Sequence, residues 1–438
     1  MTYGNRTTHR VVLALVLTGA LISIGSQASA RRSSAKSKPA LQPDMVLEWN
    51  ANAAAAIVGV AGLRPERGLI RLAMVHIAIY DAVNAIDGYP FQPYGVHPTV
   101  ISPASADAAT ATAAHDMLVA LFPAQQADLD TKYALSLSTI PDGPEKTNGI
   151  AVGQQTAAGI LALRVNDGRD ATVAYSPGSG PGVWAPTPPG FLAAAAPEAA
   201  HVQPFALNSP SQFRAEPPPL LTSDTWARDY NEVKRLGVAT GSARTPEQTD
   251  IGRFWADQPI LQWNRAWRNI SLMQGLSLEE NARFFAMLAT ATADAIIACW
   301  DSKYTYNFWR PVTAIRAGDT DGNAQTEPDV NWIAQVVTPN HPEYPAAHGC
   351  FSGSSTQTLK FFFGTDNFSF TIDSTVVGLT KAVRSYDSFS QALDEVRDAR
   401  VYGGMHYRNS AQKGAILGQQ VSRFVTAHFF RPTTARSQ

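Results

Sequence analysis

Three short segments in the last third of the chain carry side chains that bind anions and move protons. The first holds Lys303 and Arg310, with Pro311 directly after the arginine. Seven residues make nearly two helical turns, so one helix would place both cations on the same face, about 10 Å apart along its axis. Pro311 disfavours helical geometry at the residue before it, which puts Arg310 near a helix end. Arg can bond two oxygens and Lys acts as a point charge, so the pair suits a multi-oxygen anion, although two surface cations would look the same.

The second segment, residues 341–350, reads His-Pro-Glu-Tyr-Pro-Ala-Ala-His-Gly-Cys and precedes an apolar run. Pro345 is favoured as the first residue of a helix. The first backbone N–H groups of a helix have no partner inside it, so those of Ala346, Ala347 and His348 are expected to bind an anion. The imidazole of His348 would stand beside that anion and could transfer a proton. Taken alone, a His in a first helical turn more often has a structural role.

The third segment reads Arg-Val-Tyr-Gly-Gly-Met-His from Arg400 to His406. Ser388 and Gln391 form a capping pattern that predicts a helix leading to Arg400. Gly403-Gly404 would end this helix and let the chain turn sharply. We therefore expect Arg400 and His406 to project from the bend into one pocket, although a helix-terminal Arg and an unrelated His remain an alternative.

The order and spacing of these segments resemble the vanadium-dependent haloperoxidases, which form a superfamily with type 2 phosphatidic acid phosphatases and bacterial acid phosphatases. The shared pattern is Lys, six residues, Arg-Pro; then Pro-x-x-His at a helix start; then Arg, five residues, His. Weaker similarities at residues 68–86, Pro186 and Arg244 extend the resemblance over most of the chain. It implies an all-α protein with the large helical bundle fold of the vanadium haloperoxidase and acid phosphatase type.

The resemblance also implies a role for each site residue. His406 would bind vanadium axially or, in a phosphatase, accept the phosphoryl group, and His348 would be the general acid–base beside the apical oxygen. The equatorial oxygens of vanadate or phosphate would be neutralised by three cations: Lys303, Arg310 and Arg400. Three cations match an oxyanion whose negative charge grows on its equatorial oxygens during reaction.

This sequence departs from the family's usual motifs at three positions. Pro-Ser-Gly-His is usual where this chain has Pro345-Ala346-Ala347-His348, so Ala346 lacks a hydroxyl donor while Ala347 keeps its backbone N–H to bind the oxyanion. One lost donor to a charged group costs roughly 1.5–3 kcal/mol. In the third motif, Ala399 replaces a Ser and Ser410 replaces an Asp that would orient the His. The carboxylate is then absent or comes from elsewhere. Two candidates for it are Asp294 and Asp301.

The resemblance implies a haloperoxidase that binds vanadate and oxidises halide with hydrogen peroxide. One alternative is a secreted acid phosphatase that hydrolyses phosphate esters with His406 as nucleophile. Another is a non-catalytic helical protein that binds an oxyanion, which the changes at Ala346 and Ser410 would suit. The peroxidase and phosphatase interpretations predict small-molecule substrates, and the sequence leaves the oligomeric state open.

Composition agrees with a globular protein whose positive site is local. Of 438 residues, 45% are hydrophobic and 16% charged, and the net charge of −1 gives no reason to expect nucleic acid as a partner. Residues 43–171 are Ala-rich and helical in pattern. Residues 223–430 are also helical in pattern, with capping patterns at Thr245 and Ser277. Pro and Gly interrupt residues 172–222, which we expect to form an irregular belt because aromatic residues would pin it to the core. Residues 369–376 are the best candidate for a strand.

Residues 1–30 have the pattern of an export signal: Arg6 and Arg10, an apolar stretch, and Ala28-Ser29-Ala30 as a small-residue cleavage site. An uncleaved signal anchor is the alternative. Residues 31–42 are polar and basic and are expected to form a disordered tether. The sequence therefore predicts export to a periplasm or to the outside of the cell, with a mature protein that is not embedded in a membrane.

Two cysteines occur in the whole chain, Cys299 and Cys350. They lie close in sequence to Lys303 and His348, so convergence of those two residues on one anion would bring the sulfurs together. An oxidising compartment would permit a disulfide between them. The alternative is a pair of buried free thiols, which behave as small apolar side chains.

Overall fold

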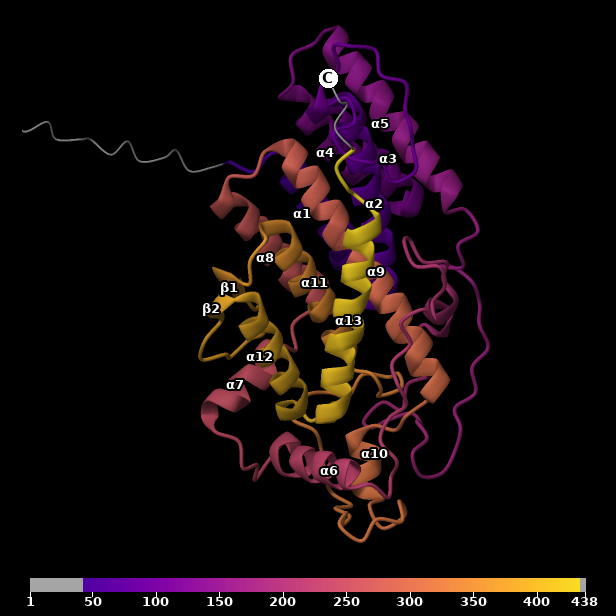
Figure 1. Ribbon diagram of the computed structural model, residues 1–438, viewed down its shortest axis with the longest axis vertical. Helices are drawn as coiled ribbons and strands as arrows, with labels where there is room; N and C mark the ends of the chain where they lie inside the picture. Colours follow the sequence, from indigo (N-terminus) through magenta and orange to yellow (C-terminus); the bar gives the residue numbers. More distant parts are fainter. Residues whose placement is uncertain (1–41, 434–438) are drawn as a thin grey trace, which may run out of the picture. The chain divides into compact units, whose positions relative to one another are not determined.

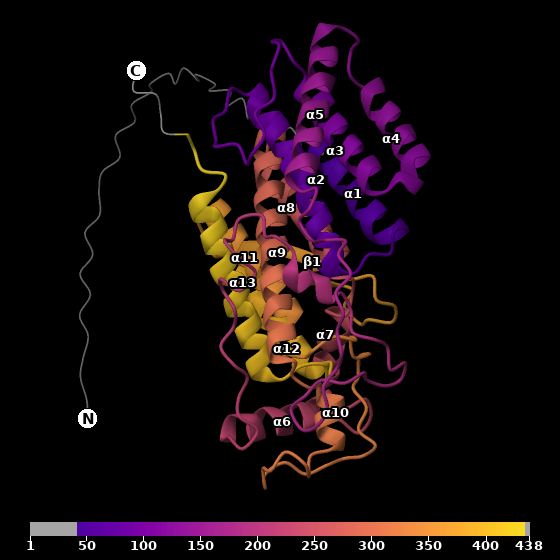
Figure 2. The ribbon, with the colours of Figure 1, turned by 90° about the vertical axis from the view of Figure 1, so that its right-hand side faces the viewer.

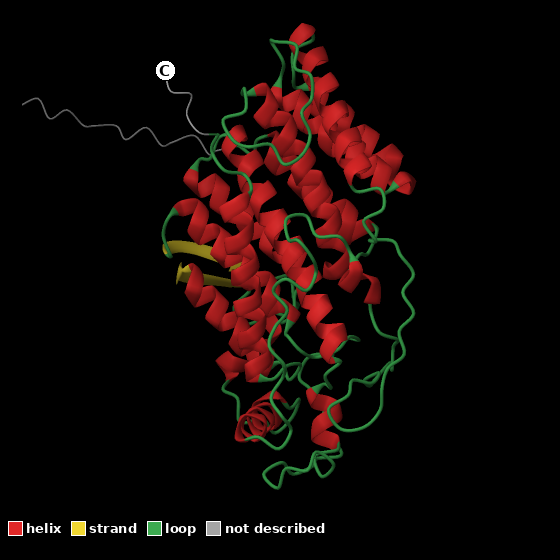
Figure 3. Cartoon of the chain, turned by 45° about the vertical axis from the view of Figure 1, so that its right-hand side comes forward, coloured by secondary structure: helices red, strands yellow, loops and turns green. Residues whose placement is uncertain are grey.

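Helices dominate the residues that this computed structural model describes, 42–433 (Figures 1 and 3). The predicted signal segment, residues 1–30, lies outside the described residues, as does the predicted tether except for residue 42. The α-helices of residues 42–433 are, in chain order, α1 Met45–Ala54, α2 Pro65–Ile86, α3 Ala106–Leu121, α4 Gln126–Ser138, α5 Pro144–Leu163, α6 Asp224–Gly237, α7 Pro246–Phe254, α8 Pro259–Gln274, α9 Leu278–Tyr306, α10 Pro311–Arg316, α11 Ala347–Phe363, α12 Phe389–Tyr402 and α13 Arg408–His428. The predicted all-α class and helical bundle are confirmed.

Local sequence signals explain where several helices begin. Both predicted capping boxes are present, at Thr245 before α7 and at Ser277 before α9, each with reciprocal side-chain bonds to the backbone. Ser388 caps α12 by accepting a hydrogen bond from the Gln391 N–H group. These side chains satisfy N–H groups that a helix start would otherwise leave without a partner.

The two long apolar helices α2 and α9 pack together in the core. Each is long and apolar enough to cross a membrane by composition, but 94% of the apolar window of each is buried among other helices, as in the core of a folded bundle. A carboxylate on α2 holds a loop. Asp81 on α2 accepts hydrogen bonds from the backbone N–H groups of Tyr94, Gly95 and Val96. Such bonds fix the loop without leaving a buried charge unpartnered.

Helices α9, α11 and α13 lie side by side and carry the candidate site at one end (Figures 1 and 2). Glycines let α11 and α13 approach each other closely. A Cβ atom on Gly353 of α11 would lie 2.4 Å from the Ala415 carbonyl oxygen, and one on Gly418 of α13 would lie 2.0 Å from the Cys350 carbonyl oxygen. Larger residues at these positions would separate the helices, so this packing fixes the distance between the second and third motifs.

The belt, residues 172–222, contains no α-helix and only one short 3-10 turn, Pro197–His201. Some of its aromatic residues pin it to the helices. Trp184 is fully buried and its backbone N–H donates to the Asn307 carbonyl oxygen at 2.8 Å. Phe205 is also buried, but Phe191 is exposed, so only part of the expected aromatic anchoring is present. The belt therefore crosses the end of α9, next to the first motif.

Two antiparallel strands form the single sheet of the described residues: β1, Asn367–Asp373, and β2, Val383–Ser388. The sequence predicted only the first, two residues late. The second alternates exposed and buried residues, but its buried positions include Arg384, whose guanidinium pairs with Glu395 at 2.9 Å. A buried Arg on a strand hides the apolar alternation on which strand prediction depends.

Candidate functional site

The first motif does not lie on one helix, which corrects the expectation for Lys303 and Arg310. Helix α9 ends at Tyr306, because Asn307 adopts the left-handed conformation with φ of +46°. Arg310 is extended and caps the next helix, α10, whose first residue is Pro311. The predicted position of Arg310 at a helix end is confirmed. An isolated β-bridge between Val183 of the belt and Phe308 holds this connection in place.

Lys303 and Arg310 nevertheless reach the same loop, residues 341–343. The Lys303 ammonium donates hydrogen bonds to the carbonyl oxygens of Pro342 at 2.9 Å and Glu343 at 3.0 Å. The Nε–H group of Arg310 donates to the carbonyl oxygen of His341 at 2.9 Å. Both cations are fully buried, so this loop brings them together at the start of α11.

The second motif starts its helix later than predicted. Helix α11 begins at Ala347 rather than at Pro345, and Ala346 is its N-cap. The N–H group of Ala346 donates to the Ser410 carbonyl oxygen at 3.1 Å, so it is not free to bind an anion. The first N–H groups that the helix leaves without a carbonyl partner are those of Ala347 and His348.

The third motif forms the expected bend. Helix α12 ends at Tyr402, and Gly404 has a φ of +77°, which favours glycine. Arg400 is buried and donates to the Trp255 carbonyl oxygen at 2.8 Å and to the Met405 sulfur at 3.0 Å. Arg310 donates to the carbonyl oxygen of the same Met405 at 2.9 Å, so both arginines converge on the bend.

His406 lies at the centre of this cluster. Its Nδ1 is 2.8 Å from Oε1 of Glu343, and its Nε2 is 3.2 Å from Nη1 of Arg310. An Arg side chain can only donate, so Nε2 must be the acceptor and Nδ1 must carry the proton given to Glu343. The Nε2 lone pair therefore faces the cations, which is the arrangement that a nucleophile or a ligand needs.

Glu343 is the residue that sequence reasoning missed. Besides His406, its carboxylate accepts a hydrogen bond from the Tyr407 N–H group at 3.1 Å. Its own N–H donates to the Phe308 carbonyl oxygen at 2.9 Å, and its carbonyl accepts from Lys303. The signal in the sequence was an acidic residue inside the second motif, five positions before His348. Glu343 thus contacts residues of all three motifs.

The two carboxylates suggested from the sequence have other roles. Asp294 accepts hydrogen bonds from backbone N–H groups of the belt, at 2.7 Å from Phe205 and Ala206. Asp301 pairs with Arg214 at 2.7 Å. Neither forms a hydrogen bond with His406, so the suggestion that one of them orients this histidine is wrong. The helical positions of Asp294 and Asp301 turn both toward the belt.

Burial shifts the pKa values of the cluster toward the uncharged forms. It lowers the pKa of Lys303 to about 8, of Arg310 to about 10 and of Arg400 to about 9, so all three remain protonated at neutral pH. Burial also raises the pKa of the Glu343 carboxyl to about 7, against the lowering effect of Arg310. Burial and the neighbouring Arg310 keep the pKa of His406 well below its ordinary value. The cluster is therefore strongly positive at neutral pH.

His348 lines the same cavity as His406 and Ala347, a hollow of about 550 Å³. Its Nε2 is buried and has no hydrogen-bond partner in residues 42–433. Burial, followed by the charge of Arg400, holds its pKa well below the ordinary value, so the imidazole is neutral and able to accept a proton. The structure thus brings all six predicted anion-site residues together: Lys303, Arg310, Ala347, His348, Arg400 and His406.

The predicted disulfide is not formed in the structure. Cys299 and Cys350 are both free and fully buried, with their sulfur atoms 2.7 Å apart. The Cys350 thiol donates to the Cys299 sulfur, and the Cys299 thiol donates to the Pro345 carbonyl oxygen at 3.7 Å. The expected proximity of the two sulfurs is therefore present without the bond.

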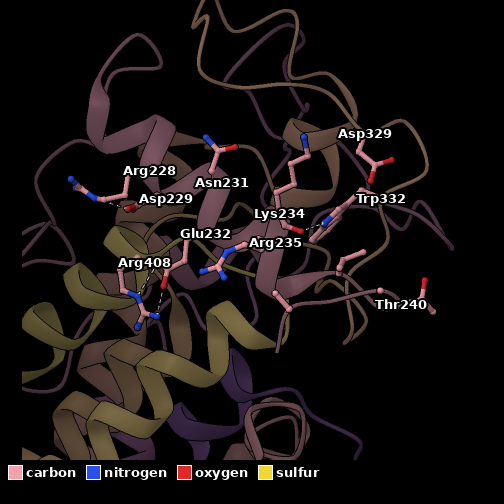
Figure 4. Close-up of a pocket in the computed structure, with 13 residues that line it drawn as sticks. Arg228, Asp229, Asn231, Glu232, Lys234, Arg235, Thr240, Asp329, Trp332 and Arg408 are labelled. Atoms are coloured by element: carbon pink, nitrogen blue, oxygen red, sulfur yellow. Dashed lines mark hydrogen bonds and ion pairs between the residues drawn. The ribbon is translucent and has the colours of Figure 1, made fainter. Parts of the chain in front are cut away.

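A larger hollow of about 960 Å³ lies elsewhere, along α6 (Figure 4). Charged side chains of both signs line it, and several bond each other. Arg408 pairs with Glu232 at 2.8 Å, and the Trp332 indole donates to the Lys234 carbonyl oxygen at 3.0 Å. This balanced groove has no histidine in its lining and does not contain the three motifs.

The site chemistry fits an oxyanion rather than a metal cation. No group of three His, Cys, Asp or Glu side chains in residues 42–433 is arranged to hold a metal ion. The cluster instead offers three cations, two helix-start N–H groups and one imidazole nitrogen. Two buried nitrogens there, Nε of Arg400 and Nε2 of His348, have no hydrogen-bond partner among the described residues. Vanadate or phosphate would supply an oxygen acceptor for the Nε–H group of Arg400 and a hydrogen-bond partner for Nε2 of His348.

The sequence matches one family model and is similar to a known enzyme. Residues 283–434 match the family model described as "VCPO second helical-bundle domain". The chain is 25% identical to vanadium chloroperoxidase from Curvularia inaequalis over 47% of this chain, a match that spans only 44% of that relative's length.

Two solved structures extend the similarity to most of the chain. The structure titled as the first bacterial vanadium-dependent iodoperoxidase superposes with a TM-score of 0.76 at 25% identity, covering 89% of this chain and 98% of that one. A holo-type bacterial vanadium-dependent chloroperoxidase superposes with a TM-score of 0.67 at 18% identity, covering 90% and 99%. The chain is thus similar in sequence and in fold to the vanadium-dependent haloperoxidases.

Proposed function

We propose that this protein is a vanadate-dependent haloperoxidase that oxidises halide with hydrogen peroxide. The observation that carries the proposal is the charge imbalance around His406. Lys303, Arg310 and Arg400 are buried together, and within residues 42–433 the one carboxylate that reaches their cluster is Glu343, through its bond with His406. Buried cations that lack an opposite charge are costly, so a bound oxyanion would stabilise this arrangement. The similarity to vanadium chloroperoxidase and to a vanadium iodoperoxidase favours vanadate as that anion.

In this proposal each residue has a definite task toward vanadate. Nε2 of His406 would hold the metal, and Lys303, Arg310 and Arg400 would neutralise its oxygens together with the Ala347 N–H group. Vanadate, when bound, would polarise hydrogen peroxide toward attack by the halide without a change in the metal's oxidation state. Glu343 would keep the proton on Nδ1 of His406, because it accepts the hydrogen bond from that atom.

Proton transfer would fall to His348. Its imidazole lines the cavity, is neutral, and has a buried Nε2 without a partner in the described residues. A neutral imidazole next to the anion can take a proton from hydrogen peroxide and return one to the departing oxygen. Burial and the surrounding cations favour the release of that proton to the departing oxygen, because they lower the pKa of the imidazole.

A phosphatase is the second candidate, and one observation favours it. The hydrogen bond from His406 to Glu343 leaves Nε2 unprotonated, as a nucleophile that forms phosphohistidine requires. The same three cations would stabilise the phosphoryl group during transfer, and His348 would protonate the leaving group.

Reconstitution with orthovanadate separates these functions. Purified protein, with and without vanadate, is assayed for halide oxidation by hydrogen peroxide and for hydrolysis of p-nitrophenyl phosphate. His428→Ala, an exposed His at the far end of α13, is the matched control for His406→Ala. We expect vanadate-dependent halide oxidation in wild type and His428→Ala only. Phosphate-ester hydrolysis inhibited by vanadate would replace the proposal with the phosphatase, and vanadate binding without either activity would indicate a non-catalytic anion-binding protein.

We also infer export to a periplasm or to the outside of the cell from the pattern of residues 1–30. Fractionation of cells that express the full chain, followed by N-terminal sequencing of the secreted form, tests this. A mature N-terminus close to Arg31 supports export, and an uncut cytoplasmic protein contradicts it.

A further inference from the structure

A small cavity adjoins Glu343, the carboxylate that accepts the hydrogen bond from His406. Its volume of about 10 Å³ gives room for one water molecule. Aromatic rings form much of its wall. The ring centroid of Tyr407 lies 4.9 Å from that of Trp226 and 5.9 Å from that of Phe308. These three residues are buried, so a molecule in this cavity must form its hydrogen bonds with the protein.

Four polar atoms of the residues that line this cavity are buried and form no hydrogen bond within residues 42–433. They are Oε2 of Glu343, Oη of Tyr407, Oδ1 of Asn409 and Oγ of Ser410. Ser410 lies near enough to lower the pKa of the Glu343 carboxyl, although its hydroxyl does not reach the geometry of a hydrogen bond. Most buried polar atoms in folded proteins have a partner, and one without a partner costs free energy. Four such atoms around one cavity therefore indicate a bound molecule.

The other polar side chains of the wall already have partners. The Trp226 indole donates to Oδ2 of Asp321 at 2.7 Å. The Tyr344 hydroxyl donates to the Glu216 carbonyl oxygen at 2.6 Å. The carboxylate of Asp229 accepts from a backbone N–H group at 2.7 Å. A molecule in the cavity is therefore held by the four atoms named above.

These four atoms match the hydrogen-bonding capacity of one water molecule. The carboxylate oxygen of Glu343 and the amide oxygen of Asn409 accept hydrogen bonds, whereas the hydroxyl groups of Tyr407 and Ser410 can donate them. Water donates two hydrogen bonds and accepts two, so one molecule would satisfy all four atoms. A metal cation in this cavity would be repelled by the cations of the site, and an anion would be repelled by the two acceptor oxygens.

We propose that this cavity binds one water molecule, which donates to Glu343 and Asn409 and accepts from Tyr407 and Ser410. Oε1 of Glu343 bonds His406, so the water occupies the second oxygen of the same carboxylate. It thereby shares the acceptor that holds the proton on Nδ1 of His406, and it moderates the strength of that hydrogen bond. The water site does not depend on the proposed function, because no vanadate takes part in it.

Denaturant unfolding of vanadate-free hydroxyl-deletion variants tests whether water is bound. Tyr407→Phe and Ser410→Ala each remove a hydrogen bond to the water, so the equilibrium constant for unfolding should rise about threefold to tenfold. Ser354→Ala is the matched control, because the Ser354 hydroxyl is also buried without a partner in the described residues but lies outside this cavity. That control should keep its stability. If the two cavity variants are as stable as wild type or more stable, their hydroxyl groups had no partner and the proposal is overturned.

Ser410→Val tests where the water binds, because its methyl groups fill the cavity and should expel the water. A high-resolution crystal structure of wild type should show one water within hydrogen-bonding distance of Oε2 of Glu343, and that of Ser410→Val should show none. In proton NMR at pH 8.5 the Nδ1–H resonance of His406 should move downfield in Ser410→Val, because the carboxylate has one donor fewer. Ser354→Val should leave it in place. Absence of the water in wild type, or an unmoved resonance in Ser410→Val, contradicts the proposal whether or not the protein oxidises halide.

Discussion

Helix α9 carries two fully buried charged residues, Asp294 and Lys303. They differ in whether the protein itself balances the buried charge. Asp294 receives hydrogen bonds from three backbone N–H groups of the belt. Nearby, the buried Arg164 pairs with Asp167 at 2.8 Å. Around Lys303, by contrast, the cations of the site donate to carbonyl oxygens, a thioether sulfur and imidazole nitrogens.

This difference separates a structural region from a binding region on the same helix. Where a buried charge has all its partners inside the protein, as Asp294 does, it fixes a loop and needs nothing more. Where three cations share one carboxylate whose pKa burial raises to about 7, the protein alone leaves positive charge uncompensated. An oxyanion of high negative charge is the natural complement to the second region. The predictions below test this contrast, from the largest expected effect to the smallest.

Removal of His406 should have the largest effect. His406→Ala would delete the covalent contact that the proposed function assigns to Nε2, so vanadate affinity should fall by at least about 100-fold and phosphatase turnover should vanish. His348→Ala should keep most of the affinity but lower turnover by roughly 10²–10⁴-fold, because it moves protons rather than forming the bond. Titration of both variants with vanadate is the measurement. Wild-type affinity in His406→Ala would refute the assignment.

The cysteine pair tests how rigidly the binding region is held. Cys299 on α9 and Cys350 on α11 lie behind Lys303 and His348, and oxidation to a disulfide should raise the free energy of unfolding by about 4 kcal/mol in the chain-entropy model. Free thiols are counted in denaturant before and after mild oxidation, and unfolding is followed in each form. Cys299→Ser provides the control without a bond. A failure of the pair to cross-link under oxidant, or a lower stability when it does, would contradict this expectation.

Lys303→Met tests whether the buried charge is uncompensated. The folded pKa of Lys303, about 8, is below its ordinary value of 10.5, so the charged form costs stability at all pH values below 8. The cost is about 3 kcal/mol, and two lost hydrogen bonds offset part of it. In phosphate-free buffer at pH 7 the variant should therefore be more stable by about 1–2 kcal/mol while vanadate affinity drops.

The pH dependence supplies the control for that variant. As pH rises from 8 toward 10.5, the folded wild type loses the Lys303 proton before the unfolded chain does, so its stability should increase relative to Lys303→Met. Denaturant unfolding of both proteins at pH 7 and pH 9.5 should thus show a shrinking difference. If Lys303→Met is the less stable protein at pH 7, the charge is compensated within the chain.

Glu343→Gln, set beside the matching change at Asp294, tests whether the carboxylate at the site contributes to vanadate affinity. Loss of the charge that orients His406 should weaken vanadate binding by about 10–100-fold. Ser410→Asp added to this variant should restore part of the affinity, because Ser410 lines a small cavity with Glu343 and its hydroxyl has no partner in the described residues. Nitrogen-15 NMR of vanadate-free protein reports the His406 tautomer independently of activity.

Asp294→Asn is the matched control for Glu343→Gln. It should lower the free energy of unfolding by about 1–3 kcal/mol through the loss of a charged acceptor and leave vanadate affinity as in wild type. Equal losses of affinity in Asp294→Asn and Glu343→Gln would mean that the carboxylates act only through general stability.

Ala346→Ser should have the smallest effect. A hydroxyl at the N-cap of α11 would add a donor to the oxyanion and tighten vanadate binding by a few-fold to about tenfold. Ala346 is fully buried against α13, and a Cβ atom on Gly414 would lie 2.4 Å from its carbonyl oxygen, so the surroundings are tight. Vanadate titration of wild type and Ala346→Ser decides. Weaker binding in the variant would show that packing, not hydrogen bonding, limits this position.

The order of the three motifs and their resemblance to the vanadium-dependent haloperoxidases predicted which residues meet, and helix signals within each motif predicted part of the local structure. The bend at Gly403-Gly404 and the extended Arg310 before Pro311 follow from residue types with restricted or special backbone geometry. The expectation that Lys303 and Arg310 share one helix failed, because Asn307 ends α9 in a left-handed conformation. Nothing in the local pattern distinguishes such an Asn from an ordinary helical one.

The role of Glu343 could not be predicted because it depends on tertiary contacts. Its partners His406 and Tyr407 come 63 and 64 residues later in the sequence, after β1, β2 and α12. Asp294 and Asp301 were candidates for the missing carboxylate, but both bond residues of the belt instead, Phe205 and Arg214. The sequence shows which ionisable residues are present, but only the folded structure shows which of them pair with one another.

The most direct test of the account is a crystal structure of the protein soaked with orthovanadate. The account predicts vanadium density bonded to Nε2 of His406 and enclosed by Lys303, Arg310 and Arg400. The charged groove along α6, where Arg408 already pairs with Glu232, should remain free of it (Figure 4). Vanadate in that groove with none at His406, under conditions in which the protein is folded, would contradict the claim that uncompensated charge marks the binding region.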